Sequence, residues 1–284
     1  MNSEIGQIVF LNGEFLPIER ARVPVLDRGF IFGDGIYEVV AVYGRRPFRW
    51  SQHLARLQRS LAKVGIRDPR DPAGWTALVR EMVERHPWRD QFVYLQVTRG
   101  VARRDHAFPA NTTPTVFAMS SELPPVPAVL RAQGVSAITL PDERWLHCDI
   151  KSTSLLGNVL ARQAAVDAGA FECVTFRDGF LTEGSASNFW VVRNGTVFGP
   201  PRDHLILEGI RCGLLDELCA AQGIPMDIRR VTREEVFAAD ELLLSSATRE
   251  LLPVTRLDGK AVGTGRPGPV WEKLHAAYQA AKAA

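Results

Sequence analysis

Alternating apolar and polar residues predict a series of short β-strands joined by tight turns. Residues 7–11 and 14–18 flank Asn12-Gly13, a dipeptide that accepts the positive φ angles of a two-residue hairpin turn. The same signal recurs later at Asp178-Gly179, Asn194-Gly195 and Asp258-Gly259. Further strands are predicted at residues 35–43, 91–99, 115–120, 135–140 and 241–246.

Apolar residues at helical spacing predict helices at residues 51–65, 75–86, 155–168, 209–222 and 270–281. In the first helix, Leu57 and Leu61 share an apolar face, and Ser51 is the predicted N-cap. Thr232 and Glu235 have the spacing of a capping box, which predicts a further helix start. Because hairpins dominate and strands do not alternate regularly with helices, the pattern predicts an α+β fold.

One stretch has the composition of a linker. Residues 123–127 read Leu-Pro-Pro-Val-Pro, and no other part of the chain is as rich in proline. We therefore predict an N-terminal domain over residues 1–122, a linker region over 123–134 and a C-terminal domain over 135–284 that carries Lys151.

The composition is that of an ordinary globular protein, with 46% apolar and 23% charged residues. A net charge of +2 does not indicate a nucleic acid or a membrane surface as partner. No apolar run is long enough to span a bilayer, and residues 1–4 do not begin a signal peptide. The cysteines show no Cys-x-x-Cys spacing and are interpreted as reduced thiols. These features predict a cytoplasmic protein without a metal site.

Lysine is scarce, because the chain has 34 basic residues and only five of them are lysines: Lys63, Lys151, Lys260, Lys273 and Lys282. A desolvated lysine can lose its proton near neutral pH and form a Schiff base with an aldehyde, which arginine cannot do. Lys151 stands among apolar and small residues, so it is a candidate for this chemistry.

Glu183 is the acid that would complete such a site. An enzyme that uses pyridoxal 5'-phosphate needs a lysine, an acid against the pyridine nitrogen, donors for the phosphate and a group that binds the substrate carboxylate. Glu183 precedes the small residues Gly184-Ser185-Ala186-Ser187, which let the backbone approach a flat ligand closely. On the residues alone, a surface lysine and a turn glutamate remain the alternative.

Three segments resemble the class IV (fold type IV) aminotransferases, and within them most resemble the bacterial D-amino acid aminotransferases. The first is residues 27–40, DRGFIFGDGIYEVV; the second is residues 144–157, which contain Lys151; the third is residues 182–188, which contain Glu183. The resemblance runs over nearly the whole chain. It implies the two-domain fold of that family and pyridoxal 5'-phosphate as cofactor.

The resemblance also implies a role for each matching residue. Lys151 forms the Schiff base and then moves a proton, Glu183 pairs with the ring nitrogen, and Arg56 binds the phosphate. Arg56 lies off the centre of its helix's apolar face, and its rigid fork of donors suits a phosphate. A solvated helix-face arginine is the alternative. Ser187 is included among the cofactor-binding residues.

The segment around Arg104 and His106 distinguishes the substrates. It resembles the Arg-x-His pair with which the D-amino acid enzymes bind the substrate α-carboxylate, assisted by the residue that matches Tyr37. In that family the pair reaches the site from the neighbouring subunit, which implies a homodimer with shared active sites. A guanidinium binds a carboxylate through two bonds, and a His or Tyr donor completes the contact. A solvated, charged loop is the alternative.

The resemblance places further residues at the cofactor and reveals two departures. Leu207 matches the residue behind the cofactor ring, with ordinary core packing as the alternative, while Ile210 and Ser246 match residues at the phosphate. The family commonly has threonine where this chain has Arg211 and Ala247. Loss of each hydroxyl donor would weaken phosphate binding by about 1 kcal/mol or more, and a charge-assisted bond from Arg211 would compensate.

The resemblance therefore predicts a ping-pong transaminase that moves the amino group between a D-amino acid, such as D-alanine, and a 2-oxo acid, such as 2-oxoglutarate. Alternatives on the same fold are a branched-chain L-amino acid aminotransferase, an (R)-amine transaminase and aminodeoxychorismate lyase. A non-catalytic protein that binds an anionic partner is a further alternative, and the low net charge argues against it.

Overall fold

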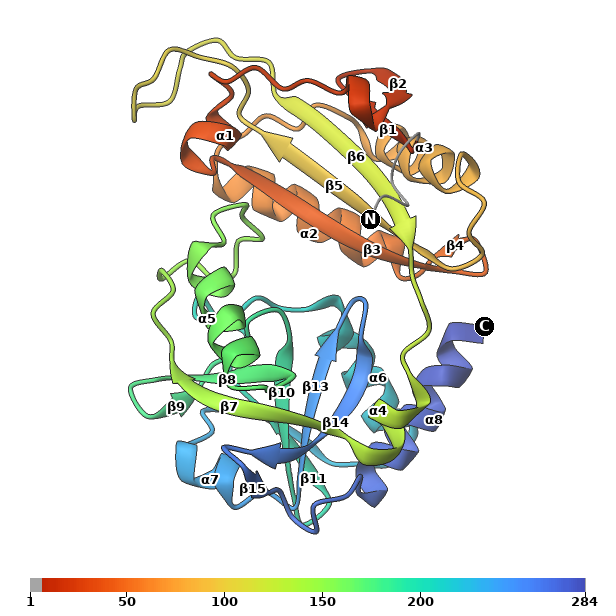
Figure 1. Cartoon of the computed structure of the whole chain (residues 1–284), viewed down its shortest axis with the longest axis vertical. Coiled ribbons are helices and arrows are strands. Elements are labelled where there is room, and N and C mark those ends of the chain that lie inside the picture. Colours follow the sequence, from red (N-terminus) through yellow and green to blue (C-terminus); the bar gives the residue numbers. More distant parts are fainter. Residues whose placement is uncertain (1–6, 284) are drawn as a thin grey trace. The chain divides into compact units, whose positions relative to one another are not determined.

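The structure is a computed structural model that describes residues 7–283, so the expectation for residues 1–4 lies outside the described residues. The chain divides into two compact units. The N-terminal unit contains the described residues up to Pro124 together with Ile150–Leu155, and the C-terminal unit contains Pro125–Asp149 and the described residues from Leu156 onward. Each unit has its own sheet (Figure 1). Each also has its own apolar core.

The N-terminal unit is built on an antiparallel sheet with the strand order β2-β1-β6-β5-β3-β4. Its strands are β1 (Ile8–Leu11), β2 (Glu14–Pro17), β3 (Gly35–Tyr43), β4 (Arg46–Pro47), β5 (Gln91–Thr98) and β6 (Thr115–Glu122). Its helices are η1 (Ile18–Arg20), α1 (Arg28–Phe32), α2 (Trp50–Lys63) and α3 (Pro72–Glu84). Leu57 and Leu61 of α2 and Trp75 of α3 pack into one core with the sheet.

The helix starts of this unit differ from the predicted ones. The prediction of Ser51 as N-cap is wrong, because α2 begins at Trp50 after Arg49, which adopts a left-handed conformation and makes no side-chain cap bond. Helix α3 begins at Pro72, earlier than predicted, because the Asp71 carboxylate accepts a hydrogen bond from Gly74 N at 2.7 Å.

The segment that carries Lys151 belongs to the N-terminal unit by its contacts, whereas the sequence analysis placed it in the C-terminal domain. Tyr37 N donates to Lys151 O at 2.9 Å, Thr153 N donates to Gly35 O at 3.0 Å, and Ser152 forms an antiparallel bridge with Ile36. These bonds satisfy the open edge of β3 near its start. Such pairing between distant segments leaves no signal in local sequence.

The C-terminal unit is built on a mixed sheet with the order β12-β11-β10-β13-β14-β7-β8-β9, and β15 pairs with β14. Its strands are β7 (Val135–Pro141), β8 (Glu172–Arg177), β9 (Phe180–Leu181), β10 (Asn188–Arg193), β11 (Thr196–Gly199), β12 (Met226–Ile228), β13 (Glu241–Ser246), β14 (Glu250–Leu257) and β15 (Lys260–Ala261). Its helices are α4 (Ala128–Gln133), α5 (Leu156–Asp167), α6 (Ile210–Ala221), α7 (Arg233–Phe237) and α8 (Pro269–Ala283).

Part of the predicted linker is helical. Helix α4 lies within residues 123–134, and Val126 and Leu130 pack against the core of the C-terminal unit. The proline-rich composition therefore marks the change of unit at Pro124, while the residues that follow belong to the second core.

The α+β prediction is confirmed, because the sheets are dominated by antiparallel pairs and helices occur between hairpins. The turns after β1, β8, β10 and β14 all have positive φ at both central residues, as their Asn-Gly and Asp-Gly sequences predict. The capping box of α7 is present, with Thr232 and Glu235 bonded reciprocally. Two parallel pairs are connected through a helix, β7 and β8 through α5 and β11 and β12 through α6, so two β-α-β units occur within the hairpin-rich fold.

Among residues 7–283, no helix is long and apolar enough to cross a membrane. Within the same range, no group of three or more His, Cys, Asp or Glu side chains is arranged to hold a metal ion. Cys148, Cys173, Cys212 and Cys219 are buried free thiols.

Candidate active site

Lys151 is held beside Tyr37 by the backbone pairing with β3. Its Nζ lies 4.2 Å from the centroid of the Tyr37 ring, so the amine stands over an aromatic face. On its other side, Lys151 N donates to Ser60 Oγ of α2 at 3.4 Å. The backbone of Lys151 therefore contacts both the sheet and the helix, which fixes where its side chain starts.

Arg56 lies one helical turn before Ser60, on the same side of α2, and both side chains are buried. Its guanidinium is bound by Glu38 of β3, with Nε donating to Oε1 at 2.7 Å and Nη2 donating to Oε2 at 2.8 Å. His53 Nδ1 lies 2.7 Å from the same carboxylate. Burial alone would raise the pKa of Glu38, but Arg56 and His53 outweigh it and hold the pKa far below its usual range. Glu38 is therefore ionised and orients Arg56.

Tyr37 is supported from the neighbouring strand. Its ring stacks on Tyr94 of β5, with centroids 5.7 Å apart, and Tyr94 Oη donates to Gln96 Oε1 at 2.7 Å. Burial, with a contribution from Tyr37, raises the pKa of Tyr94 to about 12, so this hydroxyl stays protonated.

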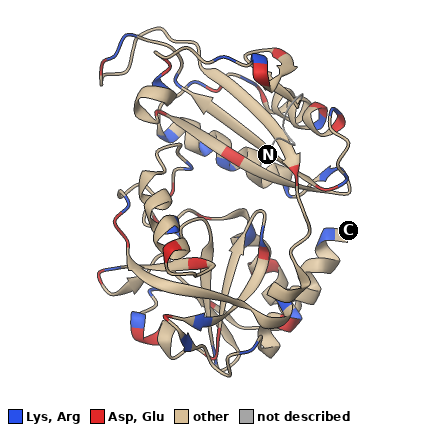
Figure 2. Ribbon diagram, viewed as in Figure 1, with Lys and Arg blue, Asp and Glu red and all other residues tan. Residues whose placement is uncertain are grey.

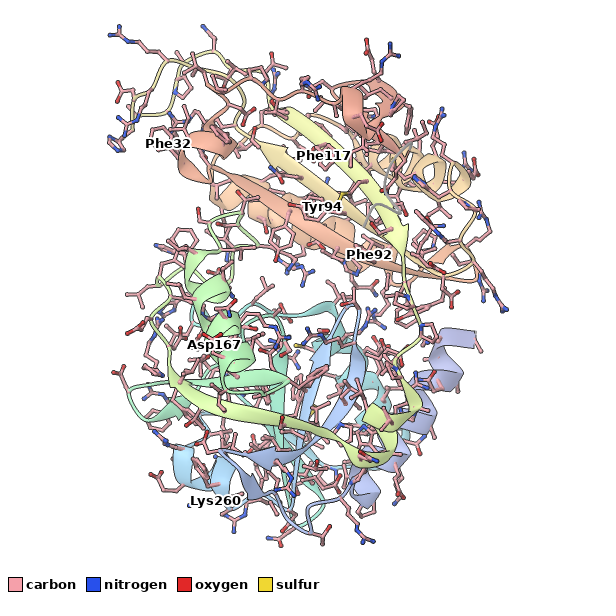
Figure 3. All side chains as sticks on the ribbon, viewed as in Figure 1. Phe32, Phe92, Tyr94, Phe117, Asp167 and Lys260 are labelled. Carbon is pink, nitrogen blue, oxygen red and sulfur yellow. The ribbon has the colours of Figure 1, made fainter. Side chains whose placement is uncertain are left out.

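Arg104 and His106 lie in the loop between β5 and β6, and both contact the ring of Phe32. Phe32 is the last residue of α1 and is labelled in Figure 3. The Arg104 guanidinium is 5.5 Å and the His106 ring 5.4 Å from the Phe32 centroid. Both side chains are exposed in this chain. The loop is fixed by Arg28, whose guanidinium donates to the carbonyl oxygens of residues 105, 106 and 107. The structure thus brings the predicted pair together on one aromatic platform.

Glu183 is the best-connected predicted residue of the C-terminal unit. Its carboxylate is ion-paired with Arg144 and accepts hydrogen bonds from Leu207 N at 3.1 Å and from Asn188 Nδ2 at 3.1 Å. Its own backbone is fixed by Thr175 N of β8, which donates to Glu183 O at 2.8 Å. Leu207, predicted behind the ring, is therefore bound to the acid through its backbone.

Burial raises the pKa of Glu183 above its usual value, although Arg144 opposes this. Arg144 does not prevail because it is shared: its Nη2 also donates to Asp142 Oδ2 at 2.8 Å, and the charge of Asp142 raises the pKa of Glu183 further. The same two carboxylates raise the pKa of Arg144 although burial alone would lower it, so Arg144 stays charged.

The start of α6 lies beside the turn that joins β13 to β14. Arg211 is buried, and its Nη2 donates to Ala247 O in that turn at 3.0 Å. Ile210 is the first residue of α6, and the first N–H groups of a helix have no acceptor within the helix. Ser246 Oγ accepts from Arg249 N at 3.2 Å. A helix start beside a turn makes an arrangement whose backbone donors suit an anion.

Ser187 is turned toward a different acid. Its Oγ donates to Glu172 Oε2 at 3.0 Å, and Ser185 Oγ donates to Glu172 Oε1. Glu172 is fully buried and organises the small-residue run after Glu183. The structure therefore shows Ser187 in a local network with Glu172, separate from the contacts of Glu183.

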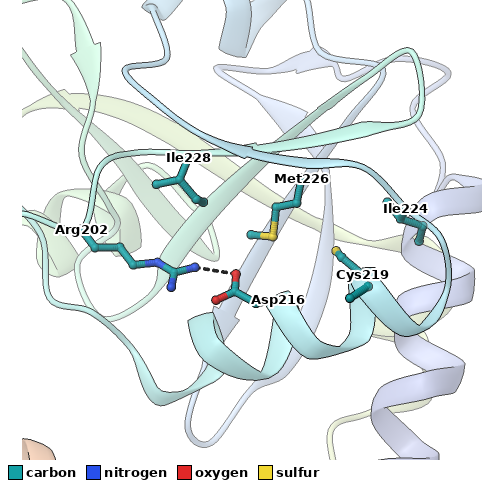
Figure 4. Close-up of a pocket in the computed structure, with 7 residues that line it drawn as sticks. Arg202, Asp216, Cys219, Ile224, Met226 and Ile228 are labelled. Carbon is teal, nitrogen blue, oxygen red and sulfur yellow. Dashed lines mark hydrogen bonds and ion pairs between the residues drawn. The ribbon is translucent and has the colours of Figure 1, made fainter.

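Two cavities can be compared in the described part of the C-terminal unit. One of about 410 Å³ is lined by Arg144, Asn158, Thr175 and Ser185, and so adjoins Glu183 through its neighbours. The other, of about 580 Å³, lies on the outer side of α6, where Arg202 pairs with Asp216 at 2.5 Å (Figure 4). No predicted site residue lines either cavity, but the first is lined by Arg144 and Gly184, which are the ion-pair partner and the chain neighbour of Glu183, whereas the second has no such link to the predicted residues.

The sequence matches the model of the amino-transferase class IV family over residues 35–257, which is most of the chain. The chain belongs to the class IV aminotransferases. These enzymes depend on pyridoxal 5'-phosphate, and this chain is therefore a pyridoxal phosphate-dependent aminotransferase.

The relatives cover nearly the whole chain. A D-alanine aminotransferase of Bacillus licheniformis is 40% identical over 271 residues, which are 95% of this chain and 95% of the relative. A D-alanine aminotransferase of Staphylococcus epidermidis is 36% identical over 95% of this chain and 96% of its own length. The crystal structure of an Escherichia coli branched-chain amino acid aminotransferase is similar with a TM-score of 0.92, covering 97% of this chain and 94% of that one. At 23% identity this likeness shows the fold alone.

The residues of each unit fit the cofactor of a class IV aminotransferase. The N-terminal unit provides an amine over an aromatic ring and a buried arginine that an ionised glutamate orients. The C-terminal unit provides a buried carboxylate with a raised pKa and the start of α6 beside a turn. A Cβ on Gly209 would lie 2.2 Å from Asn188 Oδ1, so only glycine leaves Asn188 in place to bond Glu183.

Sequence reasoning missed the residues that orient the predicted ones. They are Arg144 and Asn188 at Glu183, Glu38 at Arg56, and Arg28 under the loop of Arg104. Arg144, Glu38, Arg28 and Asn188 all occur inside the three segments that resemble the family, which is a signal that these polar residues matter but does not show which residue each of them contacts.

Proposed function

We propose that this class IV aminotransferase exchanges the amino group between a D-amino acid and a 2-oxo acid, with D-alanine and 2-oxoglutarate as representative substrates. The observation that carries the proposal is 40% identity to a D-alanine aminotransferase over 95% of both chains. The alternative activities on the same fold receive no such support.

Lys151 would perform the central proton transfer. Pyridoxal phosphate, when bound, supplies an aldehyde that bonds to an amine and a ring that accepts electrons from the substrate's α-carbon. The Nζ of Lys151 would hold the cofactor and would act as the base that takes the substrate's α-proton. The position of Nζ over the Tyr37 ring, 4.2 Å from its centroid, supports this role because the amine is directed by a rigid neighbour.

Glu183 would keep a proton at the ring nitrogen. Its raised pKa, caused by burial, brings its proton affinity closer to that of a pyridine than an exposed glutamate's would be. The bonds from Leu207 N and Asn188 Nδ2 fix the direction of the carboxylate. Leu207 would then lie at the face of the ring.

The phosphate would be bound by charge and by backbone donors. In the N-terminal unit, Arg56 is oriented by Glu38 for this task. In the C-terminal unit, the start of α6 at Ile210 and Arg211 and the turn at Ser246 and Ala247 would provide donors. Ser187 would contribute through the small-residue run that it stabilises.

Arg104 and His106 would bind the substrate carboxylate, with Tyr37 assisting, from the neighbouring subunit of a homodimer. Their exposure in the single chain and their shared contact with Phe32 support this role. The shared sites require a dimer, and exposed apolar side chains support one: on α5, Leu156, Val159 and Leu160 are 72%, 58% and 62% exposed. The proposed location is the cytoplasm, where the buried free thiols would stay reduced.

The test is amino transfer to 2-oxoglutarate from each enantiomer of alanine, followed by a panel of D- and L-amino acids and (R)-amines. We expect D-alanine to be the faster donor, and Lys151→Ala to abolish transfer because no other amine replaces it. The purified protein is expected to be yellow and to be bleached by borohydride, which reduces the bond between lysine and cofactor.

A clear preference for L-alanine would contradict the proposal and favour the branched-chain activity. Pyruvate formed from aminodeoxychorismate without an amino acceptor would favour the lyase instead.

A further inference from the structure

Glu250 adopts an unusual backbone conformation at a turn of the proposed phosphate site. It follows the three-residue loop Ala247–Arg249 between β13 and β14 and has φ +59. A hairpin loop of this length commonly ends in a left-handed residue, and glycine is preferred there because it has no Cβ. A glutamate in this conformation is strained and persists only where its surroundings hold it.

Three donors hold the Glu250 side chain, which is almost fully buried. Lys282 Nζ is ion-paired with Oε1, Gln279 Nε2 donates to Oε2 at 2.9 Å, and Arg131 Nη2 donates to Oε2 at 3.2 Å. Burial alone would raise the pKa of Glu250, but the bonds from Lys282 and Gln279 and the charge of Arg131 outweigh it and lower the pKa. The carboxylate is therefore a fixed anion.

Two of the three donors belong to the last turns of α8, where the positive charge at the helix end is visible in Figure 2. The other end of α8 is also bound to the same hairpin, because Glu241 at the start of β13 accepts from Val270 N and Trp271 N, each at 2.8 Å. A carboxylate suits the positive N-terminal end of a helix. Helix α8 thus runs along the hairpin, anchored at its open end by Glu241 and at its turn end by Glu250 (Figure 1).

The loop itself is held from two further sides. Arg211 of α6 donates to Ala247 O at 3.0 Å, and Arg249 Nη1 reaches Glu172 Oε2 of β8 at 3.5 Å. The Arg211 guanidinium also lies 5.9 Å from the ring of Tyr278 in α8. The backbone N–H groups of the loop Ala247–Arg249, which could bind a phosphate, are therefore held in place by these contacts and by the bonds of Glu250.

We propose that α8 acts as a strut that sets the conformation of the loop Ala247–Arg249, with Glu250 as the positioning residue, and so determines how tightly the cofactor phosphate is bound. The inference rests on the proposed phosphate site. Glu250 acts through the loop backbone and does not itself contact the phosphate, which its negative charge would repel. The choice of glutamate over glycine couples the loop to the C-terminal helix.

The first experiment removes the anchor on α8. In Lys282→Met the dissociation constant of pyridoxal 5'-phosphate is expected to rise about tenfold, which corresponds to about 1.4 kcal/mol. Pyridoxal, which lacks the phosphate, is expected to bind Lys282→Met and the wild type equally. Lys273→Met is the matched control, because Lys273 is an exposed lysine of the same helix. Titrations of the cofactor-free protein, followed by absorbance, measure these constants.

The second experiment distinguishes the effect of the Glu250 backbone conformation from the effect of its carboxylate. Glycine adopts the left-handed conformation without strain, so Glu250→Gly keeps the backbone conformation and removes the carboxylate. If the loop needed only that backbone conformation, this variant would bind pyridoxal 5'-phosphate as well as the wild type does. We expect it instead to bind about tenfold more weakly, and Lys282→Met in the Glu250→Gly background to add no further loss. Thermal melting of each cofactor-free variant shows that it is folded.

The proposal would be wrong if Lys282→Met and Lys273→Met had equal dissociation constants for pyridoxal 5'-phosphate. It would also be wrong if Lys282→Met weakened the binding of pyridoxal as much as that of pyridoxal 5'-phosphate. Failure of the proposed function looks different: the wild type itself would not form a yellow complex. In that case the role of α8 can still be tested by comparing how Lys282→Met and Lys273→Met bind inorganic phosphate, followed by ³¹P nuclear magnetic resonance line broadening. Binding of inorganic phosphate does not depend on the chemistry of Lys151.

Discussion

Two buried glutamates, one in each unit, have the same kind of partner and opposite shifts in pKa. Glu38 in the N-terminal unit and Glu183 in the C-terminal unit are each ion-paired with an arginine. The pKa of Glu38 is held low and the pKa of Glu183 is raised. Burial raises both, so the difference lies in the charged neighbours of each carboxylate.

The arrangement of neighbours explains the contrast. Glu38 receives both Nε and Nη2 of Arg56 and also faces His53. Glu183 must share Arg144 with Asp142, which receives Nε at 2.9 Å and Nη2 at 2.8 Å. A buried acid that receives both donors of one arginine keeps a lowered pKa and is a fixed charge, whereas the acid that shares its arginine has a raised pKa. The proposed role of Glu183 at the pyridine nitrogen would use the second property.

The largest effect is expected at Glu38. Glu38→Gln removes the charge that neutralises buried Arg56, and breaking a buried pair in this way costs about 3–5 kcal/mol of unfolding free energy. Urea denaturation of the cofactor-free protein measures it. Glu81→Gln, which removes an exposed pair with Arg85 in α3, is the control and is expected to cost only about 0.5 kcal/mol. A loss at Glu38 as small as the control's would mean that Arg56 is stable without its partner.

Substitution of Glu183 is expected to lower the catalytic rate rather than the stability of the fold. Glu183→Gln is expected to lower kcat on the order of a hundredfold, because a neutral amide cannot stabilise a proton on the ring nitrogen. Its stability without cofactor is expected to match or exceed that of the wild type, because the ionised carboxylate is unfavourable where it is buried. Glu234→Gln on α7 is an exposed control in the same unit. A strongly destabilised Glu183→Gln protein with a normal kcat would reverse the comparison.

The pH dependence of stability is expected to have opposite signs at the two acids. Glu38 has a folded pKa below its unfolded value near 4.5, so its stabilisation is present above that pH and is lost as the pH falls. Glu183 has a raised folded pKa, so its contribution is present below 4.5 and is lost as the pH rises through the folded pKa. Urea denaturation of the cofactor-free wild type, Glu38→Gln and Glu183→Gln proteins between about pH 3 and about pH 8 tests this. Two variants with the same pH slope relative to wild type would refute it.

The smallest effect tests the cause directly. Asp142→Asn removes the carboxylate that competes with Glu183 for Arg144. We expect it to lower the pKa of Glu183, which would then resemble Glu38. The coupling between Asp142→Asn and Glu183→Gln in a double-mutant cycle is expected to be about 1 kcal/mol, within the range for residues of one ion-pair network. Additive effects of the two substitutions on stability would show that Asp142 does not control Glu183.

Local features of the fold could be predicted because their causes are local. The Asn-Gly and Asp-Gly hairpins and the capping box of α7 depend on residues at most a few positions apart. Helix α1 was not predicted because it has only five residues and begins with the Asp27 cap rather than an apolar stripe. Helix α4 was hidden by the prolines that precede it.

The candidate site shows the same limit. Lys151, Glu183 and Arg56 could be named because their residue types suit the chemistry and their segments resemble a family. Their orienting partners could not, because those contacts cross long stretches of sequence: Arg144 pairs with Glu183 across 39 residues, and Arg28 reaches Asp105 O across 77. Assignment of Lys151 to the wrong domain has the same origin, since its segment joins β3 through backbone bonds.

The excursion of residues 150–155 has a consequence for protein engineering. The chain changes unit after Pro124, after Asp149 and after Leu155, so neither unit is a single stretch of sequence. A fragment cut at Pro124 would lose Lys151 and leave the edge of β3 open, and a chimera that exchanges one unit between two aminotransferases must join the parents at three places. Recombination at the proline-rich boundary alone would combine the lysine of one parent with the strand of another.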